Sequence, residues 1–348
     1  MSRVAPSANF RDPVGLLLRM LKSRNRAAYG ALFREGLRLG AMPFDRVLKH
    51  FEARTLSASS ESPHPQVLIV GAPRSGTTLV YQALAHYLNV TSPSNLSAMF
   101  LQAPLTAARL HSCLPSFSKP DFRNFYGQTT RLSGPNDAFH LWDRWLGDDR
   151  YHPAESLSED TVADMRRFLN AWTLAFDRPF LNKNNRNTSC ISLLARHLPA
   201  ARFVVVRRNP LYVAQSLIRA REQVQGDKSV GWGLQSSTSD DSADPLGYVD
   251  DVCQQIMSID RDMEQQLDHV SADRVIRVTY EGFCEHPQET ICNIALAFDG
   301  VELNPNAALH ELTPFESSRP LTLSSEEAAR IRARLQPSSD PAAAVSRC

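Results

Sequence analysis

The sequence predicts an α/β protein in which a central parallel sheet lies between two layers of helices. Three segments of the chain read as a strand, a tight turn and a helix, an order that is typical of parallel α/β sheets. Each expected strand is a short unbroken apolar run, as in a strand that is buried on both faces. The strands are expected at Val67 to Val70, Phe203 to Val206 and Val275 to Val278. The helices that follow them are expected at about 78–88, 212–221 and 288–298.

The parts of the chain outside these segments differ in character. Residues 1–62 are expected to form a helical N-terminal extension, because leucines recur at helical spacing with arginines between them. Its basic face could rest on a membrane surface, but the solvated face of a helix packed against the core is the preferred interpretation. Residues 63–336 form the expected main domain, and residues 337–348 form an expected flexible tail.

Two segments inside the main domain interrupt the strand and helix pattern. Residues 92–178 are rich in aromatic, proline and polar residues, and we expect them to form helical insertions on the substrate side of the domain. Residues 225–244 are rich in glycine, serine and aspartate, which disfavour regular structure. This second segment is predicted to be a mobile loop that closes on a bound substrate.

Composition and charge argue against several classes of protein. The 38 basic and 37 acidic residues leave a formal net charge of +1, so no global field attracts nucleic acid. No stretch approaches the ~20 apolar residues that span a bilayer, and no transmembrane segment is expected. The six cysteines show neither zinc-ligand spacing nor a disulfide framework. No metal site is therefore expected, and a cytoplasmic location is predicted.

The strongest local signal is the run GAPRSGTT, from Gly71 to Thr78, between the first strand and its helix. Two glycines at this spacing allow a tight turn, in which backbone amides and the positive end of the helix converge on an anion. An arginine within the loop adds a planar fork of donors for a phosphate or sulfate group. The expected anion-binding residues of the loop are Pro73, Arg74, Ser75, Gly76, Thr77 and Thr78.

The same loop departs from the one that grips nucleoside triphosphates. Thr77 stands where the lysine of that loop would be. The second strand is followed by Arg207 and Arg208, whereas a nucleotide hydrolase would place a magnesium-binding aspartate there. The pattern therefore predicts a ligand that is neutralised by arginine and not by magnesium.

These motifs resemble those of the sulfotransferase family that uses 3′-phosphoadenosine-5′-phosphosulfate (PAPS). The family's 5′-phosphosulfate loop reads like PRSGTT, and RRNPLYVAQS, from Arg207 to Ser216, is similar to its 3′-phosphate segment. The resemblance continues into RVTYEGFCEHPQETICNIALAF, so that it spans roughly residues 67–298. It implies the sulfotransferase variant of the P-loop NTPase-like fold, with three layers and a central parallel sheet.

The resemblance also implies a reaction and its residues. The chain would take the sulfuryl group from PAPS, release adenosine 3′,5′-bisphosphate and modify a hydroxyl of a small-molecule, lipid or carbohydrate acceptor. Arg208 and Ser216 would hold the 3′-phosphate, and Arg74 would hold the sulfonate with the loop amides. Lys183 takes the place of a family lysine that stabilises the leaving phosphate oxygen. Arg319 is expected in a segment that closes over the nucleotide.

The general base of relatives has no direct counterpart in this sequence. Asn95 lies near the position of a family glutamate, and Asn184, Asn185 and Arg186 follow Lys183, where some relatives have a histidine. The segment GPNDAFHLWDRW offers two other candidates, three residues apart, that would share a face of a helix. Asp137 is the first choice as base. His140 is the second choice, because its unperturbed pKa suits proton transfer near neutral pH.

Two other functions stay open from the sequence alone. One is an ATP-dependent phosphotransferase, which would need the missing lysine and a magnesium-binding acid. The other is a catalytically inactive module that keeps a nucleotide pocket, which the missing base positions suggest. The role of Trp142 and Trp145 is also open, since they could line an acceptor pocket or pack in the core.

Overall fold

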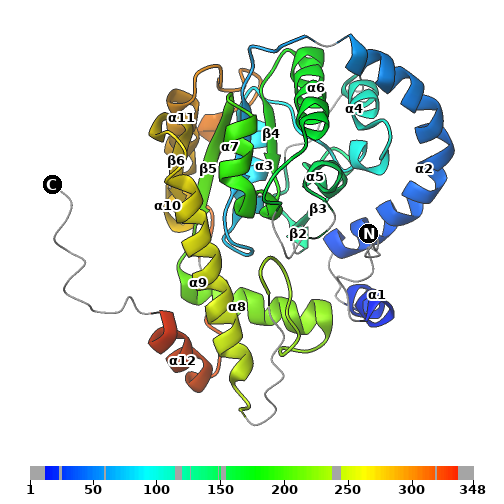
Figure 1. Cartoon of the computed structure of the whole chain (residues 1–348). Helices are drawn as coiled ribbons and strands as arrows, with labels where there is room; N and C mark the ends of the chain where they lie inside the picture. The colour runs from blue at the N-terminus through cyan, green and yellow to red at the C-terminus, as the bar shows by residue number, and fades with distance from the viewer. Residues whose placement is uncertain are drawn as a thin grey trace.

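The computed structural model describes residues 12–22, 26–58, 60–113, 120–125, 127–147, 149, 154–236, 244–317 and 320–335. Four parallel strands form a central sheet in the order β4-β1-β5-β6 (Figure 1). They are β1 (Gln66–Val70), β4 (Phe180–Lys183), β5 (Ala201–Arg207) and β6 (Val275–Thr279). The three predicted strands are confirmed. The sequence pattern missed β4, because only two of its four residues are apolar.

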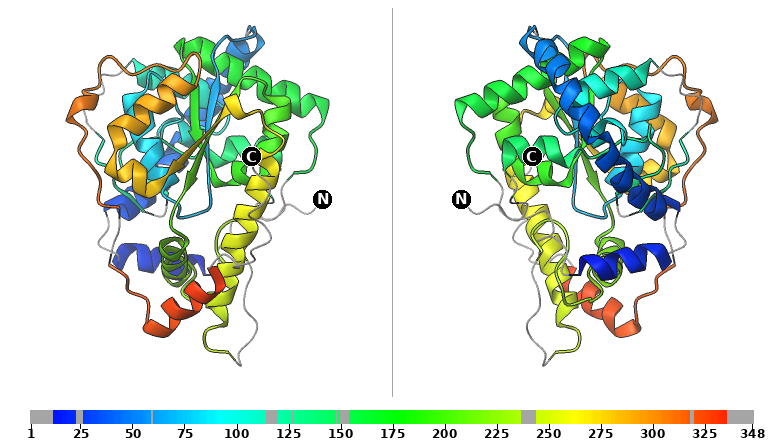
Figure 2. Two further views of the ribbon diagram at one scale, coloured as in Figure 1. Left: turned by 90° about the vertical axis from the view of Figure 1, so that its left-hand side faces the viewer. Right: turned by 90° about the vertical axis from the view of Figure 1, so that its right-hand side faces the viewer.

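Helices cover both faces of the sheet, as the alternating side chains of β1 show. Leu68 and Val70 belong to a core that contains α6 (Glu159–Phe176) and α7 (Ile191–His197). Val67 and Ile69 belong to a second core, formed with α3 (Thr77–Tyr87) and α11 (Pro287–Ala297). The predicted three-layer arrangement is therefore confirmed, and Figure 2 shows the sheet between its helical layers.

A third group of helices extends beyond the carboxyl ends of the strands (Figure 1). Its members are α8 (Pro210–Ala220), a π-helical turn (Arg221–Gln225), α9 (Gly247–Leu267) and α12 (Ser325–Leu335). The three α-helices of this group share a separate apolar core. The start of α8 is fixed by Asn209, whose side chain accepts a hydrogen bond from the Leu211 amide at 3.0 Å, and by Pro210 in its first turn.

The predicted helical insertion is confirmed, with a small hairpin added to it. It contains the short helix Ser97–Met99, α4 (Pro104–Ser112), β2 (Asn124–Phe125), β3 (Gln128–Thr129), α5 (Phe139–Leu146) and α6. Shorter elements of the main domain are 3-10 turns at Asn185–Cys190, Ala272–Arg274 and Leu309–Glu311, and α10 (Tyr280–Glu285).

The N-terminal extension is helical, as predicted, and consists of α1 (Pro13–Lys22) and α2 (Arg26–Ser57). The long helix α2 curves around the outside of the insertion (Figure 1). Its packing differs from the expected one in part, because Asp45 and Glu52 are buried while Phe33 and Phe44 are exposed. Ala28 is buried and Leu56 packs against the core, as expected of a helix packed on the main domain. Among the described residues, no helix is long and apolar enough to cross a membrane.

Candidate active site

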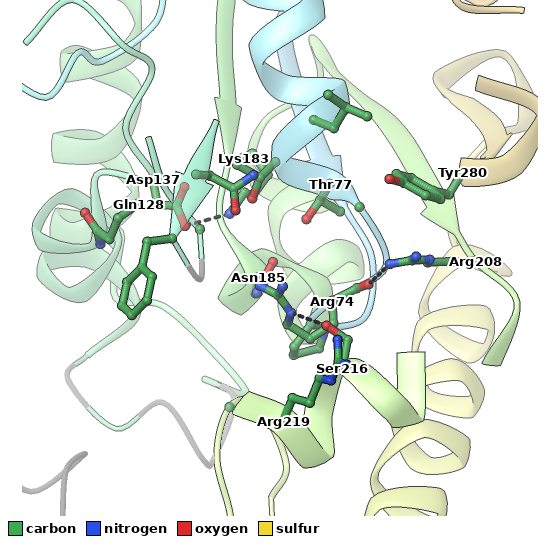
Figure 3. A pocket seen from close by; sticks show the side chains of 18 of the residues that line it. Arg74, Thr77, Gln128, Asp137, Lys183, Asn185, Arg208, Ser216, Arg219 and Tyr280 are labelled. Carbon is green, nitrogen blue, oxygen red and sulfur yellow. Dashed lines mark hydrogen bonds and ion pairs between the residues drawn. The ribbon is translucent and has the colours of Figure 1, made fainter. Parts of the chain in front are cut away.

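A cleft of about 1280 Å³ opens at the carboxyl ends of the strands (Figure 3). This edge is where ligands bind in open parallel α/β sheets. The lining comes from the loop after β1, the end of β4, the turn after β5, the start of α10 and the β2–β3 hairpin. Segments that are far apart in the sequence therefore meet around one space.

The loop between β1 and α3 has the strand, turn and helix context that the sequence predicted. Its first residue, Gly71, is held by Thr188 in the turn Asn185–Cys190. The Gly71 amide donates to the Thr188 hydroxyl at 3.0 Å, and that hydroxyl donates to the Gly71 carbonyl at 3.1 Å. At its end, Gly76 has a φ of 93° and α3 begins with Thr77. The first amides of a helix have no partner within the helix, which suits the loop to an anion.

Gly76→Ala is expected to lower the free energy of unfolding by about 1–3 kcal/mol. A Cβ at Gly76 would lie 2.0 Å from the Tyr280 ring, and the left-handed backbone adds strain. Denaturant unfolding measures the change. Gly36→Ala on α2 is the matched control, because a Cβ there meets nothing within 4 Å, and its stability should not fall. Equal stability of both variants would contradict this packing.

Three predicted binding residues meet beside the loop. Arg74 has a φ of 72°, and its Nε donates to the Ser216 hydroxyl at 2.8 Å (Figure 3). Arg208 Nη1 donates to the Arg74 carbonyl at 3.4 Å. From the sequence, Arg74 was expected at the sulfonate, apart from Arg208 and Ser216 at the 3′-phosphate. The structure instead brings its side chain to α8, so that all three face the same part of the cleft.

Tyr280 is a cleft residue that the sequence pattern did not mark as part of the site. The Arg208 guanidinium lies 4.4 Å from the centre of its ring, in the range of a cation–π contact. The sequence feature that could have marked Tyr280 is its position directly after β6, since the carboxyl ends of parallel strands lie at the same edge of the sheet.

Arg208 also donates to the Ser317 carbonyl at 3.4 Å. Arg319 itself lies outside the described residues, but the chain just before it reaches the cleft.

A buried ion pair lies in another part of the cleft. Lys183, the last residue of β4, donates from Nζ to Asp137 Oδ2 at 2.7 Å, and their side chains are 2% and 12% exposed. A Cβ at Gly127 would lie 3.7 Å from that Nζ, so the hairpin backbone passes close over the pair. Burial raises the pKa of Asp137, and the ammonium of Lys183 opposes that rise.

The end of β4 and its following residue hold Asp137 in place. The side-chain amides of Asn182 and Asn184 donate to the Asp137 carbonyl at 3.4 and 3.0 Å. Trp142 Nε1 donates to the side-chain oxygen Oδ1 of Asn182 at 2.8 Å. Trp142 and Trp145 are both buried and neither lines the cleft, so these tryptophans pack in the core.

The other expected base candidate lies elsewhere. His140 does not line the cleft, and burial lowers its pKa to about 4, so the ring is neutral near pH 7. Asn95 is also a structural residue, because its amide nitrogen donates to Thr129 Oγ1 at 2.8 Å and to the Thr130 carbonyl at 2.9 Å. Of the residues weighed as a base, Asp137 is therefore the one that the structure places at the cleft.

The predicted mobile loop lies partly within the described residues. Trp232, Gly233 and Leu234 line the cleft, and Gln255 on α9 donates to the carbonyls of Trp232 and Leu234 at 3.0 and 2.7 Å. Residues 237–243 lie outside the described part of the chain. The first half of this loop thus forms a wall of the cleft, and its mobility stays a prediction.

This fold and site define an α/β protein with an anion-binding type of loop and a group of cationic side chains around one cleft. The sequence model of the sulfotransferase family matches residues 65–305, and the chain therefore belongs to this family. No curated protein matches the chain.

Two solved structures are similar to this chain. The sulfotransferase STF9 from Mycobacterium avium is 15% identical, with a TM-score of 0.52, over 83% of this chain and 79% of that chain. The sulfotransferase STF1 from Mycobacterium tuberculosis H37Rv is 14% identical, with a TM-score of 0.48, over 93% of this chain and 86% of that chain. At 15% identity, the likeness to the Mycobacterium avium structure shows the fold alone.

Proposed function

We propose that the chain transfers the sulfuryl group of PAPS to a hydroxyl of a second molecule. The observation that carries this proposal is that two cationic side chains, Arg208 and Lys183, line one cleft together with the loop after β1. Arg208 and Ser216 are placed to hold a 3′-phosphate, while Lys183 faces the cleft from the end of β4. PAPS carries anionic groups at its 3′ and 5′ positions, and cationic side chains in two parts of one cleft suit both.

The assignment of Arg74 follows from its contacts. Its Nε already bonds Ser216, so we assign its guanidinium to the 3′-phosphate side of the donor. The 5′-phosphosulfate is then assigned to the loop amides, the hydroxyls of Thr77 and Thr78, which line the cleft, and the Lys183 ammonium. Tyr280 supports the arrangement by packing under Arg208.

The proposed chemistry is an in-line displacement at sulfur. The acceptor oxygen forms a bond to sulfur while the bond from sulfur to the bridging phosphate oxygen breaks. The hydroxyl proton passes to the Asp137 carboxylate, and Lys183 neutralises the charge on the leaving phosphate oxygen. The products are a sulfate ester and adenosine 3′,5′-bisphosphate, so atoms and charges balance.

The acceptor is proposed to carry an apolar portion. Aromatic side chains of the hairpin region and the following helix line the cleft, among them Phe125 and Phe139, and Trp232 lines it from the predicted loop. Such surfaces bind apolar or ring-shaped groups. The hydroxyl to be modified would then lie at Asp137.

The protein is expected to bind adenosine 3′,5′-bisphosphate at least about tenfold more tightly than AMP, since one extra charge-assisted contact is worth about 1.5–3 kcal/mol. Titration calorimetry in magnesium-free buffer measures both affinities. ATP with magnesium is the comparison for the phosphotransferase hypothesis, and tighter binding of it would overturn the proposed function. Bisphosphate binding without sulfate transfer to any hydroxyl acceptor would support the inactive-module hypothesis instead.

A further inference from the structure

The turn that carries Asp137 has a backbone that its own sequence does not favour. Ala138 follows Asp137 with a φ of 50°, is fully buried and directly precedes α5. An alanine in this left-handed region is strained, and such a backbone persists only where the surrounding structure holds it. The contacts that hold this turn therefore decide where the Asp137 carboxylate lies.

The neighbouring Asn136 makes the contact inside the turn. Its Oδ1 accepts a hydrogen bond from the Ala138 amide at 2.8 Å, which is the local bond by which asparagine stabilises a tight turn. Its own backbone amide donates to the Pro93 carbonyl at 2.8 Å. Its Nδ2 donates to Asn95 Oδ1 at 2.8 Å. One side chain thus closes the turn and joins it to the segment that contains Asn95.

Asn95 is anchored at the end of the β2–β3 hairpin. It is 2% exposed, and its Nδ2 donates to the carbonyls of Thr130 and Arg131 at 2.9 and 2.8 Å. Carbonyl oxygens only accept hydrogen bonds, so the amide nitrogen must face them and Oδ1 must face Asn136. The orientation of the Asn95 amide is therefore determined by its neighbours.

Thr129 gives the hairpin a second connection to the same turn. Its hydroxyl accepts from Asn95 Nδ2 at 2.8 Å and donates to the Pro135 carbonyl at 2.9 Å. Pro135 directly precedes Asn136, so the hydrogen bonds among Thr129, Asn95 and Asn136 form a closed ring with the chain. A buried network whose members are satisfied in this way makes the structure around it rigid.

The side of the turn that faces the sheet is held by β4. Asn182 Nδ2 donates to the Asn136 carbonyl at 3.2 Å, beside the bonds to the Asp137 carbonyl described above. At the end of β4, Lys183 Nζ meets Asp137 Oδ2 at 2.7 Å (Figure 3). An aspartate has only two side-chain torsions, so a backbone that is fixed from two sides leaves its carboxylate little freedom.

We propose that Asn95 and Asn136 are positioning residues for the proposed base, Asp137. Neither asparagine lines the cleft, so both act through the turn and not by contact with a substrate. These roles rest on the proposed function, because Asp137 is taken as the group that accepts the hydroxyl proton. Asn95 lies near the position of a family glutamate, and in this chain that region supports a base that another segment supplies.

The test follows the breakdown of PAPS with water as the hydroxyl acceptor, measured as release of adenosine 3′,5′-bisphosphate over a range of pH. Asn136→Asp keeps the oxygen that accepts from the Ala138 amide but loses the hydrogens that bond Asn95. It should lower kcat by about 10–10²-fold, because a misplaced reacting group can cost about 10²-fold. The KM for PAPS and the affinity for the bisphosphate should change by no more than about twofold.

Two further measurements separate this role from general damage. The fall of kcat at low pH should move to a higher pH in Asn136→Asp, since a displaced carboxylate loses the Lys183 ammonium that opposes the rise of its pKa. Asn293→Ala is the matched control, because Asn293 is an exposed asparagine on α11, and it should leave kcat and its pH profile unchanged.

Asn95→Ala removes the other half of the same hydrogen bond and should lower kcat in the same range. If both side chains act through that bond, the double variant Asn95→Ala with Asn136→Asp should lose no more than about twofold beyond the less active single variant. Asn136→Asp also keeps the proposal testable if Asn95→Ala is poorly folded.

An unchanged kcat and pH profile in both single variants would overturn these roles, and so would losses that multiply in the double variant. If the unchanged protein binds the bisphosphate but does not release it from PAPS, the proposed reaction itself is overturned, and these roles with it. The two failures are distinguishable, because only the second appears in the protein without substitutions.

Discussion

Asp137→Asn is expected to lower the turnover number by about 10²–10⁴-fold, the usual contribution of a general base. The amide has nearly the same shape as the carboxylate, but it cannot take the acceptor's proton. Steady-state rates with saturating PAPS measure the loss. His140→Gln is the comparison, and it should change turnover by less than about tenfold, because His140 lies outside the cleft lining.

The pH dependence of kcat/KM is a second measurement on Asp137→Asn. The reaction requires ionised Asp137, so kcat/KM should fall as the pH drops through the pKa of that carboxyl. Burial raises this pKa above the ordinary 3.8, which moves the loss of activity to a higher pH than for a solvated aspartate. The pH profile of Asp137→Asn should lack this fall of kcat/KM at low pH, which we call the acidic limb. An unchanged limb in the variant would assign the base to another residue and leave the donor site as proposed.

Arg208→Ala is expected to weaken the binding of adenosine 3′,5′-bisphosphate by about 10²-fold, since a lost charge-assisted bond to a dianion costs about 1.5–3 kcal/mol or more. The affinity for AMP, which has no 3′-phosphate, should change little. The difference between the two ligands, measured by calorimetry, separates loss of this contact from general damage to the cleft.

Arg207 provides the matched control for this substitution. It is the neighbouring arginine, but its guanidinium is exposed and pairs with Glu264 at 2.5 Å on α9. Arg207→Ala should therefore change the affinity for the bisphosphate by no more than about twofold, which is much less than the change expected when a contact with the phosphate is lost. Equal effects of the two substitutions would show that charge near the cleft matters and that the placement of Arg208 does not.

The parts of the site that spacing along the sequence predicted are the local ones, whereas Lys183 was named through the family resemblance. The loop after β1 and the pair Arg208 and Ser216 each lie within one strand, turn and helix unit, so spacing along the chain determines how close their backbones lie. The hydrogen bond from Arg74 to Ser216 joins two such units, so it cannot be predicted from residue spacing within either unit. It depends on the left-handed backbone of Arg74, which turns that residue toward α8.

The parts that the sequence could not predict depend on the order of strands and on tertiary packing. β4 has too few apolar residues to be recognised, yet it places Lys183 beside β1 and opposite Asp137. Tyr280 joins the site because β6 ends at the same edge as β5. Which face of α2 packs inward was not predictable either, because Asp45 and Glu52 find their partners just before α4 and in its first turn, more than fifty residues further along the chain.

Arg34 connects α2 to the hairpin at the wall of the cleft. From α2, its guanidinium donates to the Thr129 carbonyl at 2.9 Å and to the Gln128 side chain at 3.2 Å, and Gln128 lines the cleft. Thermodynamic linkage then sets a strict condition. If an acceptor in the cleft shifts the hairpin and so changes the affinity of any ligand that contacts α2, that ligand must change the affinity for the acceptor by the same factor.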